Sequence, residues 1–211
     1  ATTTNNTDDP IVELCKKLSI SFFRGSESDV LLRVYEAHKY LKSSLVVELT
    51  GDCPLIDPKI IDNCIEIYLK NNFDYVSNVH VRSFPDGFDT QVFSYDLLDK
   101  VNKLANSKFD RENVTPYIYK NNNENSFKLK AVIAEDANFW PDLRVTLDDI
   151  GDYKLLKTII KEFYPTIGIN FNCKNIMDYL KRNKHLLDLL KDVRKTSNPY
   201  QKTINKIEKN L

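Results

Sequence analysis

The chain has 211 residues, of which 42% are hydrophobic and 28% charged, an ordinary composition for a soluble globular protein. Its 30 basic and 30 acidic residues give zero net charge, which argues against a general nucleic-acid binder. No apolar run approaches the roughly 20 residues of a membrane helix, and we expect no signal peptide and no membrane partner. Four scattered cysteines without a CxxC pair favour reduced thiols in a cytoplasmic protein.

Helix and strand patterns alternate along the first part of the chain. Apolar residues at helical spacing predict helices, and short apolar runs predict strands, in the order helix 9–18, strand 19–23, helix 28–41, strand 45–49, helix 58–71 and strand 74–78. Asp57 precedes Pro58 as a helix N-cap before a proline at the first helical position. This order predicts an α/β fold with a largely parallel, doubly wound sheet.

The pattern changes after residue 80. Further strands are expected at 90–94, 128–133 and 143–147, and further helical segments at 95–107, 111–120, 151–163, 175–179 and 184–193. Residues 121–125 form a polar loop of mostly asparagine. The basic end, 195–211, is either a frayed tail or an amphipathic helix that docks on a partner.

The sequence TGDCPLID at 50–57 directly follows the apolar run at 45–49. Asp52 therefore stands at the carboxyl end of an expected strand, the edge at which open α/β sheets bind ligands. Gly51 lets a backbone or a ligand approach closely, and an acid beside it suits a divalent cation bound to a phosphate. Helix capping explains Asp57 but not Asp52, so Asp52 is a candidate functional residue.

Five blocks of sequence resemble one family when taken together. They are RGSESDVLLR at 24–33, TGDCPLID at 50–57, FPDGFDTQVF at 84–93, DRENVTPYIY at 110–119 and DLRVTLDD at 142–149. In this order they resemble the SpsF-type cytidylyltransferases, which are related to the enzymes that activate acylneuraminate and 3-deoxy-manno-octulosonate sugars. The resemblance covers roughly residues 1–165.

The resemblance implies a Rossmann-like nucleotide-diphospho-sugar transferase (GT-A-like) fold with a mixed, mostly parallel sheet. It implies a nucleotidyltransferase domain at 1–165 and a helical extension of that domain at 166–211. The implied reaction is attack of a sugar oxygen on the α-phosphate of CTP with release of pyrophosphate. The partners are then CTP and a sugar, and related enzymes often form homodimers.

Several site residues follow from the resemblance. Asp52 and Asp148 match acids that bind Mg²⁺. Capping of the helix at 151–163 is the alternative for Asp148 and for Asp149, and we favour metal binding for Asp148. Thr3, Ser26, Asp29 and Gly51 are expected near the nucleotide, although capping also explains Ser26 and Asp29.

Five further residues are expected to contact the sugar: Asp86, Asp89, Gln91, Arg144 and Arg111. Asp86 and Asp89 lie in the loop that lines the sugar pocket of the family, although Asp86 also suits a solvated turn. Gln91 stands where many relatives have glutamate, and Arg144 is a charge in an expected strand that suits a polar cleft. Arg111 is placed to hold the carboxylate of an acidic sugar, because a guanidinium binds carboxylates bidentately.

The family begins with a strand and a glycine- and arginine-containing loop that wraps the triphosphate. We expect that loop to lie outside these 211 residues, so that this chain lacks its phosphate donors. Two other functions stay open. One is a GT-A-type glycosyltransferase, although the Asp-x-Asp pair that would favour it is absent at residues 52–54. The other is a non-catalytic binding module.

Overall fold

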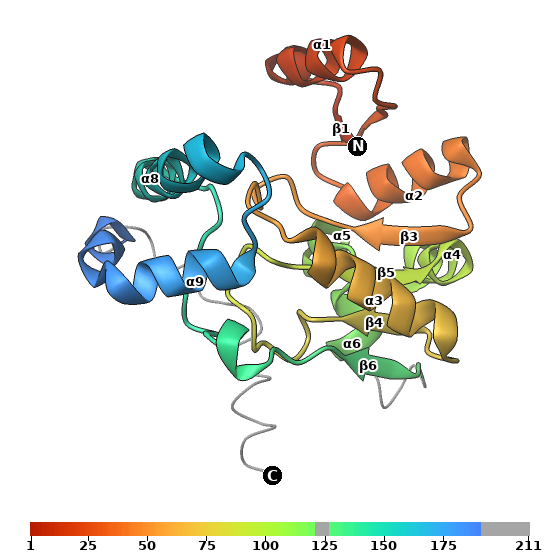
Figure 1. Cartoon of the computed structure of the whole chain (residues 1–211). Coiled ribbons are helices and arrows are strands. Elements are labelled where there is room, and N and C mark those ends of the chain that lie inside the picture. Colours follow the sequence, from red (N-terminus) through yellow and green to blue (C-terminus); the bar gives the residue numbers. More distant parts are fainter. Residues whose placement is uncertain (121–126, 191–211) are drawn as a thin grey trace. The chain divides into compact units, whose positions relative to one another are not determined.

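The computed structural model describes residues 1–120 and 127–190 (Figure 1). They divide into two compact units that alternate along the chain. The first unit comprises the described residues of 1–46, 72–75 and 93–129, and the second those of 47–71, 76–92 and 130–211. The boundary at residue 165 between a domain and its extension stays a prediction. The predicted loop at 121–125 and the tail at 195–211 lie outside the described residues.

A four-stranded sheet has the order β3-β5-β4-β6. Its strands are β3 (Leu45–Glu48), β5 (Gln91–Ser94), β4 (Tyr75–Ser77) and β6 (Leu129–Ala131), and each has residues in both units. All of β4 and the first three residues of β5 are buried, as expected of strands that are covered on both faces. The sheet and its helices confirm the predicted α/β class.

In the first unit, a two-residue parallel pairing joins β1 (Thr2–Thr3) to β2 (Arg24–Gly25). The predicted strand at 19–23 is wrong, because pairing begins only at Arg24. Helix α2 packs against α4 and α5. The helical elements of this unit are η1 (Asn6–Asp8), α1 (Asp9–Lys17), α2 (Val30–Leu41), α4 (Tyr95–Leu104), α5 (Lys108–Asn113) and α6 (Pro116–Lys120).

In the second unit, the helical elements are α3 (Pro58–Lys70), η2 (Asp136–Asn138), α8 (Ile150–Ile167), α9 (Cys173–Arg182) and η3 (Lys184–Leu190). Asp57 caps α3 as predicted, since one carboxylate oxygen accepts a 2.9 Å hydrogen bond from the Lys59 N–H. Its other oxygen accepts a 2.9 Å hydrogen bond from the Cys173 N–H, so one buried carboxylate holds the starts of α3 and α9. Among the residues described, no helix combines the length and apolar character needed to cross a membrane.

Candidate active site

The turn that follows β3 places Asp52 in the second unit. The Cys53 N–H donates a 3.2 Å hydrogen bond to the Thr50 carbonyl, and the Thr50 hydroxyl lies 3.1 Å from the Cys53 sulfur. Burial raises the pKa of the Cys53 thiol to about 12, and the charges of Asp52, Asp89 and Asp86 add to the shift. Cys53 is therefore a neutral thiol, and its sulfur lies 3.8 Å from the Asp52 carboxylate.

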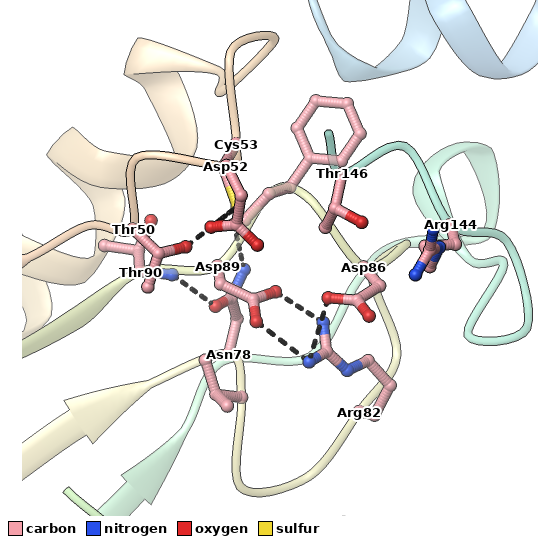
Figure 2. A network of polar contacts seen from close by, with 12 residues as sticks. Thr50, Asp52, Cys53, Asn78, Arg82, Asp86, Asp89, Thr90, Arg144 and Thr146 are labelled. Atoms are coloured by element: carbon pink, nitrogen blue, oxygen red, sulfur yellow. Dashed lines mark hydrogen bonds and ion pairs between the residues drawn. The ribbon is translucent and has the colours of Figure 1, made fainter. Parts of the chain in front are cut away.

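The loop between β4 and β5 carries Asp86 and Asp89. Asn78, which is fully buried, donates from its amide to the Phe88 carbonyl at 2.8 Å and accepts from the Thr90 N–H at 2.8 Å. One side chain thus holds the main chain on both sides of Asp89 (Figure 2).

The segment at 143–147 joins this loop to the turn that carries Asp52. The Asp86 N–H donates to the Leu143 carbonyl at 2.9 Å, and the Val145 N–H donates to the Asp86 carbonyl at 2.8 Å. The Leu147 N–H donates to the Asp52 carbonyl at 2.8 Å. The predicted strand at 143–147 is wrong, because the segment pairs with a loop and a turn and forms a single bridge, between Arg144 and Asp86.

Gly87 allows the loop to approach this segment. Its φ of +114° is one that side-chain-bearing residues rarely adopt, and a Cβ there would lie 2.8 Å from Cγ2 of Val145 and 2.9 Å from its carbonyl oxygen. The turn sequence Pro85-Asp86-Gly87 is therefore required for close packing as well as for chain reversal.

A buried arginine lies among the acids of the loop. Arg82 forms ion pairs with Asp89 and, at 3.6 Å, with Asp86 (Figure 2). Burial and the negative charges of Asp89 and Asp52 together raise the pKa of Asp86 to about 6, against the opposing effect of Arg82 and Arg144. Asp52 therefore lies close enough to act on the charge of Asp86, although the two residues are 34 positions apart in the sequence.

Arg144, in the segment at 143–147, and Asp148 both precede α8 in the chain and contact each other. The Asp148 carboxylate is 3.2 Å from the Arg144 guanidinium and accepts a 2.9 Å hydrogen bond from the Thr146 hydroxyl. Asp149 caps α8, as its alternative interpretation predicted, by accepting from the N–H groups of Gly151 at 2.8 Å and Asp152 at 3.2 Å.

Sequence reasoning missed four polar residues of this unit: Glu48, Asn78, Arg82 and Asp152. Asp152 is buried and accepts from the Asp148 N–H at 2.9 Å and from Arg144. The spacing of Asp149 and Asp152 is a capping-box signal that could have identified it. Glu48 was recognisable as an acid in an otherwise apolar strand, whereas no local pattern distinguished Asn78 or Arg82.

Gln91 faces Glu48 in the second unit. The Gln91 amide donates a 3.3 Å hydrogen bond to the Glu48 carboxyl group, whose pKa burial raises to about 8. The Gln91 amide thus contacts the Glu48 carboxyl group directly. A glutamate at position 91 would instead place two acids side by side.

The nucleotide-binding candidates of the first unit all have structural partners. The Thr3 hydroxyl donates to Asp8 at 2.6 Å, and the Ser26 hydroxyl accepts from the Asp29 N–H at 3.1 Å. Asp29 caps α2 by accepting from the Leu32 N–H at 2.9 Å. Their contacts with a nucleotide stay predictions.

Arg111 also has a partner in the first unit. Its guanidinium binds Asp29 bidentately, with Nε–Oδ1 at 2.9 Å and Nη2–Oδ2 at 2.6 Å. The expected role in holding a sugar carboxylate stays a prediction, and it would require this guanidinium to exchange Asp29 for the ligand.

The acids of the second unit fit a metal only in part. Within 1–120 and 127–190, no three His, Cys, Asp or Glu side chains are arranged to hold a metal ion by themselves. Mg²⁺ in nucleotide enzymes usually takes one or two carboxylates and completes its shell with phosphate oxygens and waters. Asp52 suits that chemistry, because its carboxylate is half-buried and forms no ion pair among the described residues. The hydrogen bond from the Leu147 N–H to the Asp52 carbonyl also brings the residue that precedes Asp148 into contact with Asp52.

Comparison with known proteins shows the family to which the chain belongs. The model of a cytidylyltransferase family matches residues 1–206. An uncharacterized protein of Methanocaldococcus jannaschii is 40% identical over 197 residues, which cover 93% of this chain and 78% of that protein. The spore coat polysaccharide biosynthesis protein SpsF of Bacillus subtilis is 29% identical over 163 residues, or 77% of this chain and 66% of SpsF.

A solved structure supports the same assignment. The structure of a cytidylyltransferase from Leptospira borgpetersenii matches with a TM-score of 0.80 and 33% identity, over 87% of this chain and 75% of that one. The fold is therefore the α/β fold of nucleotidyltransferases. The chain belongs to the cytidylyltransferase family and is a nucleotidyltransferase of the SpsF type.

Proposed function

We propose that the protein is a Mg²⁺-dependent cytidylyltransferase that transfers CMP from CTP to a sugar, with release of pyrophosphate, during synthesis of a polysaccharide or glycan. The observation that carries the proposal is the half-buried Asp52 at the end of β3, tied through its carbonyl to Leu147. Similarity to SpsF, a spore coat polysaccharide biosynthesis protein, supports a role in polysaccharide synthesis. An acidic sugar is the substrate class that we propose.

Nucleotidyl transfer needs an aligned nucleophile and neutralisation of charge at phosphorus, with little covalent help from the protein. Asp52 and Asp148 are the residues that would hold Mg²⁺, which supplies that neutralisation when bound. Asp86 is suited to accept a hydrogen bond from a sugar hydroxyl and so to orient the sugar. Gly51, which has open space around its Cα, allows close approach of a phosphate or ribose.

The test is release of pyrophosphate by the full-length chain from CTP, Mg²⁺ and a panel of acidic and neutral sugars. Asp52→Asn should lower turnover at least about a thousandfold if Asp52 holds the metal, because the lost charge acts directly at the transition state. Asp62→Asn is a matched control, since Asp62 is exposed on α3. Unchanged turnover in Asp52→Asn would remove Asp52 from the mechanism.

Calorimetric titration separates this proposal from the two other functions that the sequence left open. Binding of CTP in the presence of Mg²⁺ supports a cytidylyltransferase. Heat with UDP-sugars but none with CTP favours a glycosyltransferase. Binding of CTP without pyrophosphate release, whatever sugar is supplied, favours a non-catalytic binding module.

A further inference from the structure

The two acids of the loop at 85–89 have different environments. Asp89 has a side chain that is 16% exposed, and both its oxygens bind the guanidinium of Arg82, with Nη2–Oδ2 at 2.9 Å. Asp86 has a side chain that is 35% exposed and lies 3.6 Å from Arg82, beyond hydrogen-bonding distance. Both oxygens of Asp89 are therefore engaged by Arg82, whereas Asp86 is the more exposed carboxylate and does not hydrogen-bond Arg82, so it is the better placed of the two to accept hydrogen bonds from a ligand.

The buried guanidinium of Arg82 requires a negatively charged partner. Its side chain is only 2% exposed, and a buried charge is costly unless it is paired and hydrogen-bonded. A bidentate carboxylate meets that need, and Asp89 supplies it. The guanidinium binds Asp89 bidentately and reaches Asp86 only at 3.6 Å, so Asp86 is the less tightly paired carboxylate of the loop.

The main chain around Asp86 is held from several directions. Both its N–H and its carbonyl bond the segment at 143–147, and Gly87 packs against Val145. Asn78 holds the residues on either side of Asp89. Arg82 links this fixed loop end to Asp86, and Figure 2 shows its guanidinium between the two carboxylates.

We propose that Arg82 is a positioning residue of the sugar site, held by Asp89, and that it orients Asp86 as the carboxylate that accepts a hydrogen bond from a sugar hydroxyl. This inference rests on the proposed function. It reverses the expectation from the sequence, which favoured Asp89 over Asp86 for holding sugar hydroxyls or a second metal, because Asp89 then serves as the counterion of Arg82 and does not contact sugar or metal.

The experiment measures kcat and the separate KM values for CTP and sugar in the full-length chain, with the thermal unfolding midpoint of each variant. Asp86→Asn should raise the KM for the sugar about 10- to 100-fold, the range for loss of a charged hydrogen bond, and leave the KM for CTP unchanged. Arg82→Lys should raise the KM for the sugar about tenfold, because lysine keeps the charge but lacks the planar fork.

The double variant Asp86→Asn/Arg82→Lys tests whether Arg82 acts through Asp86. Its KM for the sugar should equal that of Asp86→Asn alone, because the residue that Arg82 orients has already lost its charge. Additive effects of the two substitutions, or an Arg82→Lys effect on both KM values alike, would overturn the inference. Arg182→Lys is the control, since Arg182 is exposed at the end of α9.

A second variant guards against simple unfolding. Arg82→Met/Asp89→Leu removes the buried pair without leaving an unpaired charge, an exchange that proteins often tolerate. We expect it to keep its unfolding midpoint within a few degrees and to show the raised KM for the sugar, and an unchanged KM in a folded double variant would refute the role of Arg82. Absence of pyrophosphate release by the wild type is a different failure, which contradicts the proposed function and this inference together.

Discussion

The main-chain N–H of Leu147 donates a 2.8 Å hydrogen bond to the carbonyl oxygen of Asp52. Three residues earlier, Arg144 forms a bridge with Asp86. Three residues span at most about 10 Å, so one short segment holds the main chain at two acids, Asp52 and Asp86, that are 34 positions apart in the sequence. The stability of this segment therefore bears directly on the site.

Gly87→Ala should destabilise the second unit by about 2–4 kcal/mol. Alanine at a φ of +114° is strained, and its Cβ would lie 2.8 Å from the Val145 side chain. Urea unfolding measures the loss. Gly51→Ala is the matched control, because nothing lies within 4 Å of a Cβ at Gly51, and its stability should change by less than about 0.5 kcal/mol. Equal stability of the two variants would contradict the packing role of Gly87.

Glu48→Gln should stabilise the protein at high pH. The folded-state pKa of Glu48 is about 8, above its ordinary value of 4.5, so the folded chain holds this proton more tightly than the unfolded chain. The cost of burying Glu48 is therefore absent below pH 4.5, grows as the pH rises towards 8 and is constant above it. Each pH unit in that window contributes at most about 1.4 kcal/mol.

Urea unfolding of Glu48→Gln at pH 5 and pH 8 measures this effect. We expect the stability gain over the wild type to be larger at pH 8 by about 3–4 kcal/mol, since most of the window between 4.5 and 8 lies between these two pH values. Glu162→Gln is the control, because Glu162 is exposed on α8, and its difference from the wild type should be similar at both pH values. A gain for Glu48→Gln that is independent of pH would show that Glu48 does not titrate in this window.

Asp148→Ala and Asp149→Ala should affect different properties. Asp149 accepts two main-chain N–H groups at the start of α8, so its removal should cost about 1 kcal/mol of unfolding free energy. Asp148 has a side chain that is 46% exposed, so its removal should change stability by less than about 0.5 kcal/mol. If Asp148 holds the metal, pyrophosphate release should fall at least about a hundredfold in Asp148→Ala. Full activity in that variant would leave Asp148 with only its contacts to Arg144 and Thr146.

Arg111→Gln should destabilise the first unit by about 1–3 kcal/mol, because it leaves Asp29 without its bidentate partner. Lys103→Gln, which removes an exposed pair with Asp99, is the control and should cost at most about 0.5 kcal/mol. Thermal unfolding measures both. If Arg111 also holds a sugar carboxylate, Arg111→Gln should raise the KM for an acidic sugar more than that for CTP.

Local patterns in the sequence determined much of this protein. Helical periodicity placed most helices to within a few residues, because the repeat of apolar side chains is set by each helix itself. The segment predicted as helical at 111–120 is instead two helices, α5 and α6, separated at Val114, whose φ is +68°. The caps at Asp29, Asp57 and Asp149 were predictable for the same reason, since a capping side chain bonds N–H groups two or three residues away. The five ordered blocks identified the family, and with it the fold.

Contacts between distant residues were decided only by the tertiary structure. Arg111 and Asp29 are separated by 82 positions, and the segment at 143–147 reads as a strand although its partners are a loop and a turn. Arg82 is an ordinary charged residue in the sequence, and only burial beside Asp89 gives it a required partner. The sequence marked Asp52, Asp86, Asp89 and Asp148 as acids at loop positions. The fold separated their roles, because the side chains that approach each carboxylate decide whether it pairs within the protein or remains available to a ligand.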